Sequence, residues 1–233
     1  MIPIYGLQKT TLLDFPGHVA STLFLGKCNF RCPYCQNSSL LDPKNLPPAY
    51  TEEDVYTHLH KRKGILEGVC ITGGEPTLTK ELKSFIQTIK EMGYHVKLDT
   101  NGSNPSMLSE LLEEGLLDMV AMDIKNSLAH YGITIGIPQY NTKPVEESVE
   151  LLKKSGIPYE FRTTLVKELH CKEDLLAISQ WLEGPSAYFL QNYEDSSDVL
   201  VKGLHGFTTH ELQELLLIVK PLVPNVSLRG VTL

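Results

Sequence analysis

Two spacings of hydrophobic residues alternate along the chain, and they predict strands and helices in turn. Short apolar or β-branched segments, each followed by glycine or a polar residue, predict strands. The six predicted strands are residues 19–25, 69–72, 95–99, 119–122, 159–165 and 187–190. Between them, apolar residues recur at the 3.6-residue period of an amphipathic helix. One predicted helix begins at Thr51, and the others cover residues 80–92, 105–114, 144–155, 172–182 and 208–219.

Strands that alternate with helices pair in parallel through right-handed crossovers. A closed barrel of eight such units takes about 250 residues, whereas this chain has 233 residues and six predicted units. We therefore expect an α/β fold: a partial (β/α)6 TIM-like barrel of parallel strands with outer helices. Residues 225–228 are expected to add an edge strand. No linker interrupts the pattern, so we expect a single domain over residues 1–233.

The composition is that of a globular protein, with 42% hydrophobic and 21% charged residues. A net charge of −7 argues against nucleic acid as a partner, because phosphate binding needs a basic face. No apolar run approaches the ~18 residues that span a bilayer, so we expect no membrane partner. Five cysteines are too few for a disulfide scaffold, and the first residues do not resemble a signal peptide. We expect a cytoplasmic location.

Three cysteines lie close together directly after the first predicted strand. Cys28, Cys32 and Cys35 have the spacing C-x3-C-x2-C, and thiolates of this kind select zinc, Cu(I) or iron–sulfur clusters. Structural zinc and [4Fe–4S] clusters usually take four protein ligands. Three cysteines would leave one iron open to a non-protein ligand, which is a catalytic arrangement. The alternatives are structural cysteines or zinc completed by a remote histidine. We expect Cys70 and Cys171 to be structural.

Polar residues follow several of the predicted strands, where ligands bind in parallel sheets. The second strand ends in Gly73 and Gly74, which allow close backbone approach, and in Glu75, which can accept hydrogen bonds from an ammonium group. The alternative is a simple glycine-rich turn. The third strand ends in Asp99 and Thr100, which are placed to meet a ribose or a cation. There the alternative is an Asn-Gly turn.

The later strands carry further candidates. Asp123 and Lys125 follow the fourth strand, and strand alternation points both side chains the same way, toward the expected cavity. The alternative is a solvated ion pair at the surface. Arg162 lies within the fifth strand, and a buried arginine needs an anionic partner. That partner is either a ligand carboxylate or a core carboxylate. Gln191, at the end of the sixth strand, is a candidate of the same kind.

The cysteine motif, with Tyr34 before its last cysteine, resembles the radical S-adenosylmethionine (SAM) enzymes. The resemblance implies that Cys28, Cys32 and Cys35 bind one [4Fe–4S] cluster, whose fourth iron binds the amino and carboxylate groups of SAM. One electron then cleaves SAM into methionine and a 5′-deoxyadenosyl radical. The backbone near Tyr34 would contact the adenine. The segment 73–76 resembles the family's GGEP motif, which binds the methionine amino group and implies that role for Gly73, Gly74 and Glu75.

The residues after the third and fourth strands resemble those of the glycyl-radical-enzyme activases. That resemblance implies a monovalent cation site formed by Asp99, Thr100 and Asp123 beside the SAM carboxylate. Lys125 would contact substrate or SAM, so Lys125 and Asp123 are the candidate catalytic residues. Independently of the resemblance, a SAM carboxylate would serve as the anionic partner that a buried Arg162 needs.

Segments 6–17 and 26–37 are similar to the longer class of anaerobic ribonucleoside-triphosphate reductase activating proteins. This implies a glycyl radical enzyme as partner, that reductase above all, and a flavodoxin or ferredoxin as electron donor. Gln36 stands where many activases have histidine. The alternatives are an activase of another glycyl radical enzyme, a radical SAM enzyme acting on a small molecule or peptide, and a non-catalytic iron–sulfur or zinc protein.

Overall fold

The computed structural model describes residues 2–43 and 47–230. Its centre is one sheet of eight strands that follow each other in sequence order. The strands are β1 (Ile4–Thr11), β2 (Ala20–Leu25), β3 (Gly68–Gly73), β4 (His95–Thr100), β5 (Met119–Asp123), β6 (Tyr159–Leu165), β7 (Ala187–Asn192) and β8 (Val226–Arg229). Strand β1 is antiparallel to β2, and every later pair is parallel. Because β1 and β8 are not paired with each other, the sheet is an open barrel.

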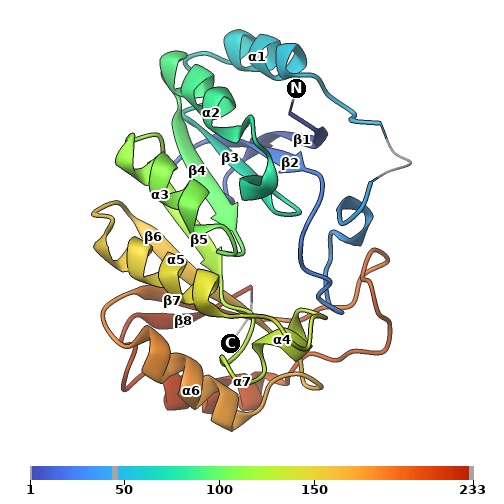
Figure 1. The fold of residues 1–233 in the computed structure, drawn as a ribbon, viewed down its shortest axis with the longest axis vertical. Helices are drawn as coiled ribbons and strands as arrows, with labels where there is room; N and C mark the ends of the chain where they lie inside the picture. Colours follow the sequence, from blue (N-terminus) through green and yellow to red (C-terminus); the bar gives the residue numbers. More distant parts are fainter. Residues whose placement is uncertain (1, 44–46, 231–233) are drawn as a thin grey trace.

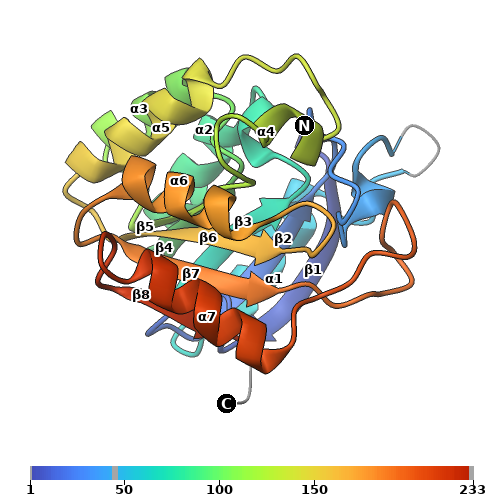
Figure 2. The ribbon, with the colours of Figure 1, turned by 90° about the horizontal axis from the view of Figure 1, so that it is seen from below.

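Helices cover the outer face of this curved sheet (Figures 1 and 2). The covering helices are α1 (Glu52–Lys61), α2 (Leu82–Glu91), α3 (Pro105–Glu113), α5 (Lys143–Lys154), α6 (Lys172–Leu182) and α7 (Thr209–Val219). Three short helices lie in the segments that follow strands: the 3-10 helices η1 (Ser38–Leu40) and η2 (Pro76–Leu78), and α4 (Tyr131–Thr134). Helix α1 begins where its capping residue predicts, because Thr51 accepts a hydrogen bond from the Asp54 amide in a reciprocal capping box. No helix of the described residues is long and apolar enough to cross a membrane.

The predicted α/β partial barrel is confirmed. The six predicted strands are β2 to β7, the expected edge strand is β8, and the predicted helices are α1 to α3 and α5 to α7. Two elements were not predicted, namely β1 and α4. Strand β1 has register irregularities against β2, and its exposed Gln8, Lys9 and Thr10 interrupt any apolar period. The expectation of one domain over residues 1–233 stays a prediction.

The two faces of the central strands differ in polarity. On the side of the helices, residues such as Val96, Leu98, Val120, Met122 and Phe161 are buried in the hydrophobic core. The alternate residues face the inside of the barrel and are largely polar: Thr22, Thr72, Asp99, Asp123, Arg162, Thr164 and Gln191. A closed TIM barrel fills this space with bulky apolar side chains. Here the polar interior leaves a cavity.

Candidate active site

The cavity has a volume of about 430 Å³ and extends to the carboxyl ends of the parallel strands. Every residue predicted for the site lines it except Glu75. These lining residues are Cys28, Cys32, Tyr34, Cys35, Gly73, Gly74, Asp99, Thr100, Asp123, Lys125, Arg162 and Gln191. Residues from strands far apart in the sequence therefore meet at one site, as the rule for parallel sheets predicts.

The cysteine loop leaves β2 through a sharp turn. Lys27 has a φ of 72°, a left-handed conformation that non-glycine residues seldom adopt and that often marks functional segments. Within the loop, the Phe30 amide donates to the Cys28 sulfur at 3.4 Å and the Cys35 amide donates to the Cys32 carbonyl at 3.0 Å. These contacts fold the loop so that its three thiols share one wall of the cavity.

Burial raises the pKa of all three thiols, that of Cys32 to about 12. Each thiol therefore has to release a proton before it binds a soft metal centre. In the described part of the chain, no group of three His, Cys, Asp or Glu side chains is already arranged as a metal site. None of the described histidines lines the cavity, so zinc completed by histidine has no nearby fourth ligand. Three cysteines facing an open cavity fit a cluster with one free iron.

The two glycines after β3 hold the start of the cysteine loop. A Cβ atom on Gly73 would lie 2.3 Å from the Leu25 carbonyl oxygen, and one on Gly74 would lie 2.1 Å from that of Lys27. This close approach allows the Gly74 amide to donate to Leu25 at 2.9 Å and the Glu75 amide to donate to Lys27 at 2.7 Å. The glycines therefore fix the chain that leads into Cys28.

Glu75 has a structural position that its motif did not predict. Its carboxylate is fully buried and accepts four hydrogen bonds: from the Thr77 hydroxyl (2.5 Å) and amide (3.1 Å), the Thr100 hydroxyl (2.7 Å) and the Asn101 amide (2.6 Å). Burial raises the pKa of Glu75, and these donors lower it in part. The carboxylate thus ties η2 to the turn that follows β4.

Asn101 connects that same turn to the cysteine loop. Its amide nitrogen lies 3.8 Å from the Cys28 sulfur and donates to the Asn29 side chain at 3.0 Å. The sequence predicts only a turn at Asn101, since nothing in the local sequence indicates contact with a loop more than 70 residues away. On the other side of the loop, the Arg31 amide donates to the Ile135 carbonyl at 2.8 Å. The segment after α4 therefore helps to hold the cysteine loop.

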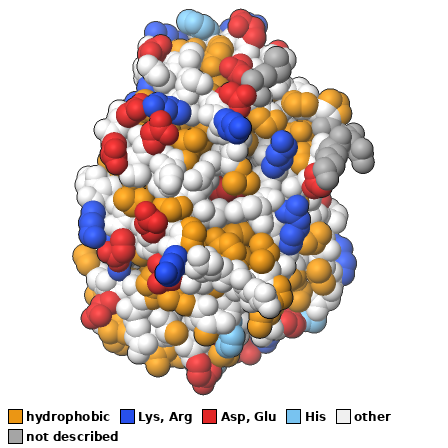
Figure 3. All heavy atoms as spheres, viewed as in Figure 1, with side chains coloured by type: hydrophobic (Ala, Val, Ile, Leu, Met, Phe, Trp, Pro, Cys, Tyr) orange, Lys and Arg blue, Asp and Glu red, His pale blue; other side chains and the backbone are white. Residues whose placement is uncertain are grey.

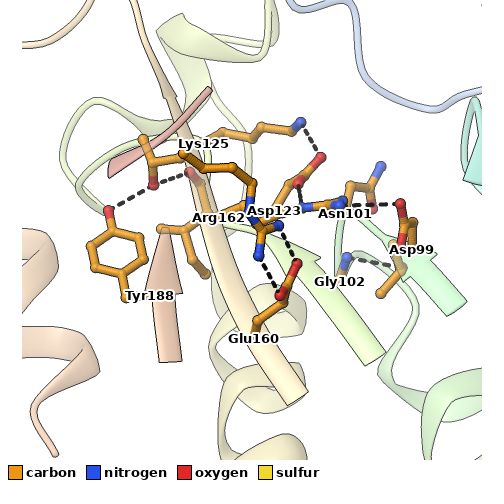
Figure 4. A network of polar contacts seen from close by, with 12 residues as sticks. Asp99, Asn101, Gly102, Asp123, Lys125, Glu160, Arg162 and Tyr188 are labelled. Carbon is orange, nitrogen blue, oxygen red and sulfur yellow. Dashed lines mark hydrogen bonds and ion pairs between the residues drawn. The ribbon is translucent and has the colours of Figure 1, made fainter. Parts of the chain in front are cut away.

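A chain of alternating charges crosses the cavity wall (Figure 4). Arg162 donates from Nε to Asp123 Oδ1 at 3.0 Å and from Nη1 to Asp99 Oδ2 at 3.1 Å. Lys125 Nζ donates to Asp123 Oδ2 at 2.9 Å, and Lys97 Nζ donates to Asp99 Oδ1. Asp123 and Arg162 are direct partners in the β5–β6 pair. Arg162 therefore has two carboxylates of the chain as partners and also lines the cavity.

The charges in this chain stabilise each other. Burial raises the pKa of Asp99 and Asp123, but the nearby Arg162 and lysines outweigh it, so both pKa values are lowered. Burial lowers the pKa of Lys125 and Arg162, but the carboxylates outweigh it and raise both. These four groups are thus charged at neutral pH. Lys97, which the sequence did not single out, is almost completely buried beneath them.

Two glutamines, the predicted Gln191 and the unpredicted Gln36, also line the cavity. Gln191 on β7 is the register partner of Thr164 on β6, and both line the cavity. Gln36 also lines the cavity, but its amide donates to the Glu194 carbonyl at 2.9 Å. At the position of the usual histidine, this chain therefore has a side chain that holds the segment after β7.

Comparison with known families decides the class of this site. The family model described as "Radical SAM superfamily" matches residues 22–176, from β2 through the cysteine loop into α6. The chain belongs to the radical SAM superfamily. The resemblance of the cysteine motif to radical SAM enzymes is confirmed, and the superfamily implies a [4Fe–4S] cluster and SAM. The assignment of Cys28, Cys32 and Cys35 as the cluster ligands stays a prediction.

Relatives agree with that assignment. A Methanocaldococcus jannaschii protein named as a glycyl-radical enzyme activating enzyme is 30% identical over 98% of this chain and 96% of its own length. A pyruvate formate-lyase-activating enzyme from Streptococcus mutans is 28% identical over 73% of this chain and 68% of its own.

Solved structures with low sequence identity share the fold. A domain of a pyruvate-formate lyase-activating enzyme from Bacteroides vulgatus is 17% identical over 70% of this chain and 99% of its own, with a TM-score of 0.57. Streptococcus suis SuiB is 15% identical over 88% of this chain and 47% of its own, with a TM-score of 0.68. The open barrel is therefore that of radical SAM enzymes.

Proposed function

We propose that this radical SAM enzyme generates a glycyl radical on a partner protein, and that the partner is an anaerobic ribonucleoside-triphosphate reductase. The observation that carries the proposal is the similarity, over nearly the whole chain, to a glycyl-radical enzyme activating enzyme. The choice of reductase rests on the resemblance of segments 6–17 and 26–37. A flavodoxin or ferredoxin as electron donor, and a cytoplasmic location, are parts of the same proposal.

Cys28, Cys32 and Cys35 would hold the cluster. When bound, the cluster and SAM supply a 5′-deoxyadenosyl radical that takes a hydrogen atom from a glycine Cα. The chain's own task is to bind SAM in one orientation and to keep water from that radical. The charged wall of Asp123, Lys125 and Arg162 offers the electrostatic contacts for orientation, with Asp123 and Lys125 as the candidate catalytic residues, since they line the cavity.

Other residues would act on SAM from the remaining walls. The backbone near Tyr34 would contact the adenine, and the backbone of Gly73 and Gly74 would face the methionine moiety. A contact of Glu75 with the amino group of SAM stays a prediction, and it requires one of its four present hydrogen bonds to give way. Gln191 would contact ligand from β7.

The open side of the barrel suits a protein loop as substrate. On the face in Figure 3, uncharged and hydrophobic side chains dominate the central part, and the charged ones lie mostly around it. A partner that covers this face would bring its glycine to the cavity and exclude solvent. No general acid or base is needed for hydrogen-atom transfer, so the charged residues serve binding rather than proton transfer.

Anaerobic electron paramagnetic resonance tests the proposal. The reconstituted protein is mixed with SAM, a reductant and the same organism's anaerobic reductase, and a glycyl-radical doublet is expected only when all are present. Cys32→Ala should abolish iron binding and the doublet, whereas Cys171→Ala, away from the cavity, should keep both. Reductive cleavage of SAM without a glycyl-radical doublet would reject this partner.

A second candidate partner is a pyruvate formate-lyase. The similarity to the Streptococcus mutans enzyme favours it, because that alignment also covers most of the chain. The same assay with a pyruvate formate-lyase in place of the reductase separates the two. A doublet on that protein alone would assign the chain to it.

A further inference from the structure

The cation site implied by the activase resemblance is already filled by the chain itself. Asp99 and Asp123 were expected to share a monovalent cation, yet all four of their carboxylate oxygens accept a hydrogen bond from lysine or arginine. Asp99 is held by Lys97 and Arg162, the latter at 3.1 Å. Asp123 is held by Arg162 at 3.0 Å and by Lys125 at 2.9 Å.

The third expected ligand is engaged as well. The Thr100 hydroxyl donates to Glu75 Oε1 at 2.7 Å and accepts a hydrogen bond from the Gly102 amide at 3.1 Å. A metal ion at this point would have to displace these partners, and hard cations prefer oxygen ligands that are free to converge on them. The oxygens expected to bind the ion are instead directed to nitrogen donors of the chain.

The charge balance points the same way. Three cationic side chains and two carboxylates form the network, so its net charge is +1. A further monovalent cation would be repelled by Lys97, Arg162 and Lys125. An anionic carboxylate, by contrast, would bring the network to neutrality. The side chains of Lys97, Asp99 and Arg162 are only 2%, 13% and 15% exposed, so dissolved salt screens these charges little.

We propose that the network of Lys97, Arg162 and Lys125 takes the place of a bound monovalent cation, so that this enzyme binds the SAM carboxylate without potassium or sodium. The proposal rests on the proposed function insofar as SAM is the ligand. Arg162 and Lys125 line the cavity, where they would meet that carboxylate. Lys97 is a positioning residue, because it lies behind Asp99 and holds that carboxylate in place of a metal ion.

The position of Lys97 explains why it can act only through Asp99. Lys97 lies two residues before Asp99 on β4, so both side chains point into the barrel. The Lys97 ammonium group is also 3.8 Å from the Cys70 sulfur. It does not line the cavity. Lysine is seldom buried unless it is paired, so loss of its charge would leave Asp99 with Arg162 alone. A small cation could then enter beside Asp99.

SAM binding in different salts tests the proposal. Equilibrium dialysis with the anaerobically reconstituted protein compares potassium, sodium and tetramethylammonium chloride at equal ionic strength, since tetramethylammonium is too large for such a site. We expect the three dissociation constants of the wild type to agree within about twofold. A loss of about tenfold in tetramethylammonium, corresponding to about 1.4 kcal/mol, would overturn the proposal.

A variant provides the reverse test. Lys97→Met keeps the length of the side chain and removes its charge, so SAM affinity should fall about tenfold or more in tetramethylammonium and recover in potassium or sodium. Lys90→Met is the matched control, because Lys90 pairs with Asp118 at 2.7 Å away from the cavity, and it should show no salt preference. A Lys97→Met variant that folds but shows the same affinity in all salts as the wild type would overturn the role of Lys97.

The wild-type comparison stands even if Lys97→Met does not fold. Thermal unfolding of the wild type without SAM gives an independent reading, with equal midpoints expected in potassium and tetramethylammonium chloride. A higher midpoint in potassium would contradict the proposal. Absence of SAM binding in every salt would overturn the proposed function together with this inference, whereas cation-dependent binding would overturn the inference alone.

Discussion

Replacing Glu75 by alanine should destabilise the fold, because its carboxylate accepts hydrogen bonds from two backbone amides that have no other acceptor among the described residues. The Thr77 and Thr100 hydroxyls can turn to other acceptors, but the Thr77 and Asn101 amides are fixed. Each buried donor left without a partner costs about 1–3 kcal/mol. The free energy of unfolding should therefore fall by roughly 2–6 kcal/mol, a large share of the 5–15 kcal/mol typical of domains.

Urea unfolding of the thiol-reduced protein measures this loss, with the fluorescence of the one tryptophan, Trp181, as the signal. Glu75→Gln keeps one acceptor oxygen and turns an NH2 group toward the remaining donors, so its loss should be intermediate. Glu147→Ala is the matched control, because Glu147 is exposed on α5. It should change the free energy of unfolding by no more than about 0.5 kcal/mol.

A second measurement follows from the position of Asn101. If Glu75 holds the turn that contacts the Cys28 sulfur, the Glu75→Ala variant should also bind less iron on reconstitution. A fall of less than about 1 kcal/mol in unfolding free energy, with full iron content, would refute the reasoning. The carboxylate would then be free to serve a ligand instead of the turn.

Two further predictions concern the cysteine loop. Because burial raises the pKa of Cys32 to about 12 and raises that of the other two thiols, binding of Co²⁺ has to release up to three protons. The affinity for Co²⁺, followed by thiolate-to-cobalt absorption, should rise by up to about a thousandfold per pH unit near neutrality. The control Cys171→Ser should show the same pH dependence as the wild type, and pH-independent binding would contradict this prediction. Gly74→Ala would place a methyl group 2.1 Å from the Lys27 carbonyl oxygen and should reduce iron incorporation. Gly64→Ala adds a methyl group in open space at a positive φ of 84°, so it carries the backbone strain of alanine without a close contact, and it should leave iron content unchanged. Equal iron content in both variants would refute the proposed close contact.

The regular parts of the fold could be predicted because local patterns determine them. Buried parallel strands such as β3 and β5 consist of short apolar segments with polar residues at their ends, and amphipathic helices such as α2 repeat at 3.6 residues. Strand β1 has no such pattern, since its pairing with β2 is irregular and three of its eight residues are exposed. Helix α4 has four residues, too few for a period. Both depend on tertiary contacts.

The site could be predicted as a set of positions but not as a set of interactions. Strand ends meet in any parallel sheet, so Asp99, Asp123 and Arg162 were expected in one cavity. Which charges pair depends on the register between strands, which a single sequence does not reveal. For the same reason Lys97 was missed, because nothing in the sequence of β4 shows that this lysine is buried and paired with Asp99 two residues later. The burial of Glu75 likewise depends on donors contributed by another strand end.

An open barrel that keeps its centre free for ligands loses the apolar contacts that would otherwise hold its strands together. In this chain, ion pairs inside the barrel take over part of that role. Arg162 joins β6 to β4 and β5, and Arg229 on β8 binds Glu160 on β6 through two hydrogen bonds of 2.7 and 2.8 Å while stacking on Phe189. Such pairs stabilise little when exposed, but removing one partner of a buried pair costs about 3–5 kcal/mol. Under the proposed function, the charged residues of the cavity would serve both SAM binding and the shape of the sheet, so a substitution of Arg162 that weakens SAM binding should also lower the free energy of unfolding.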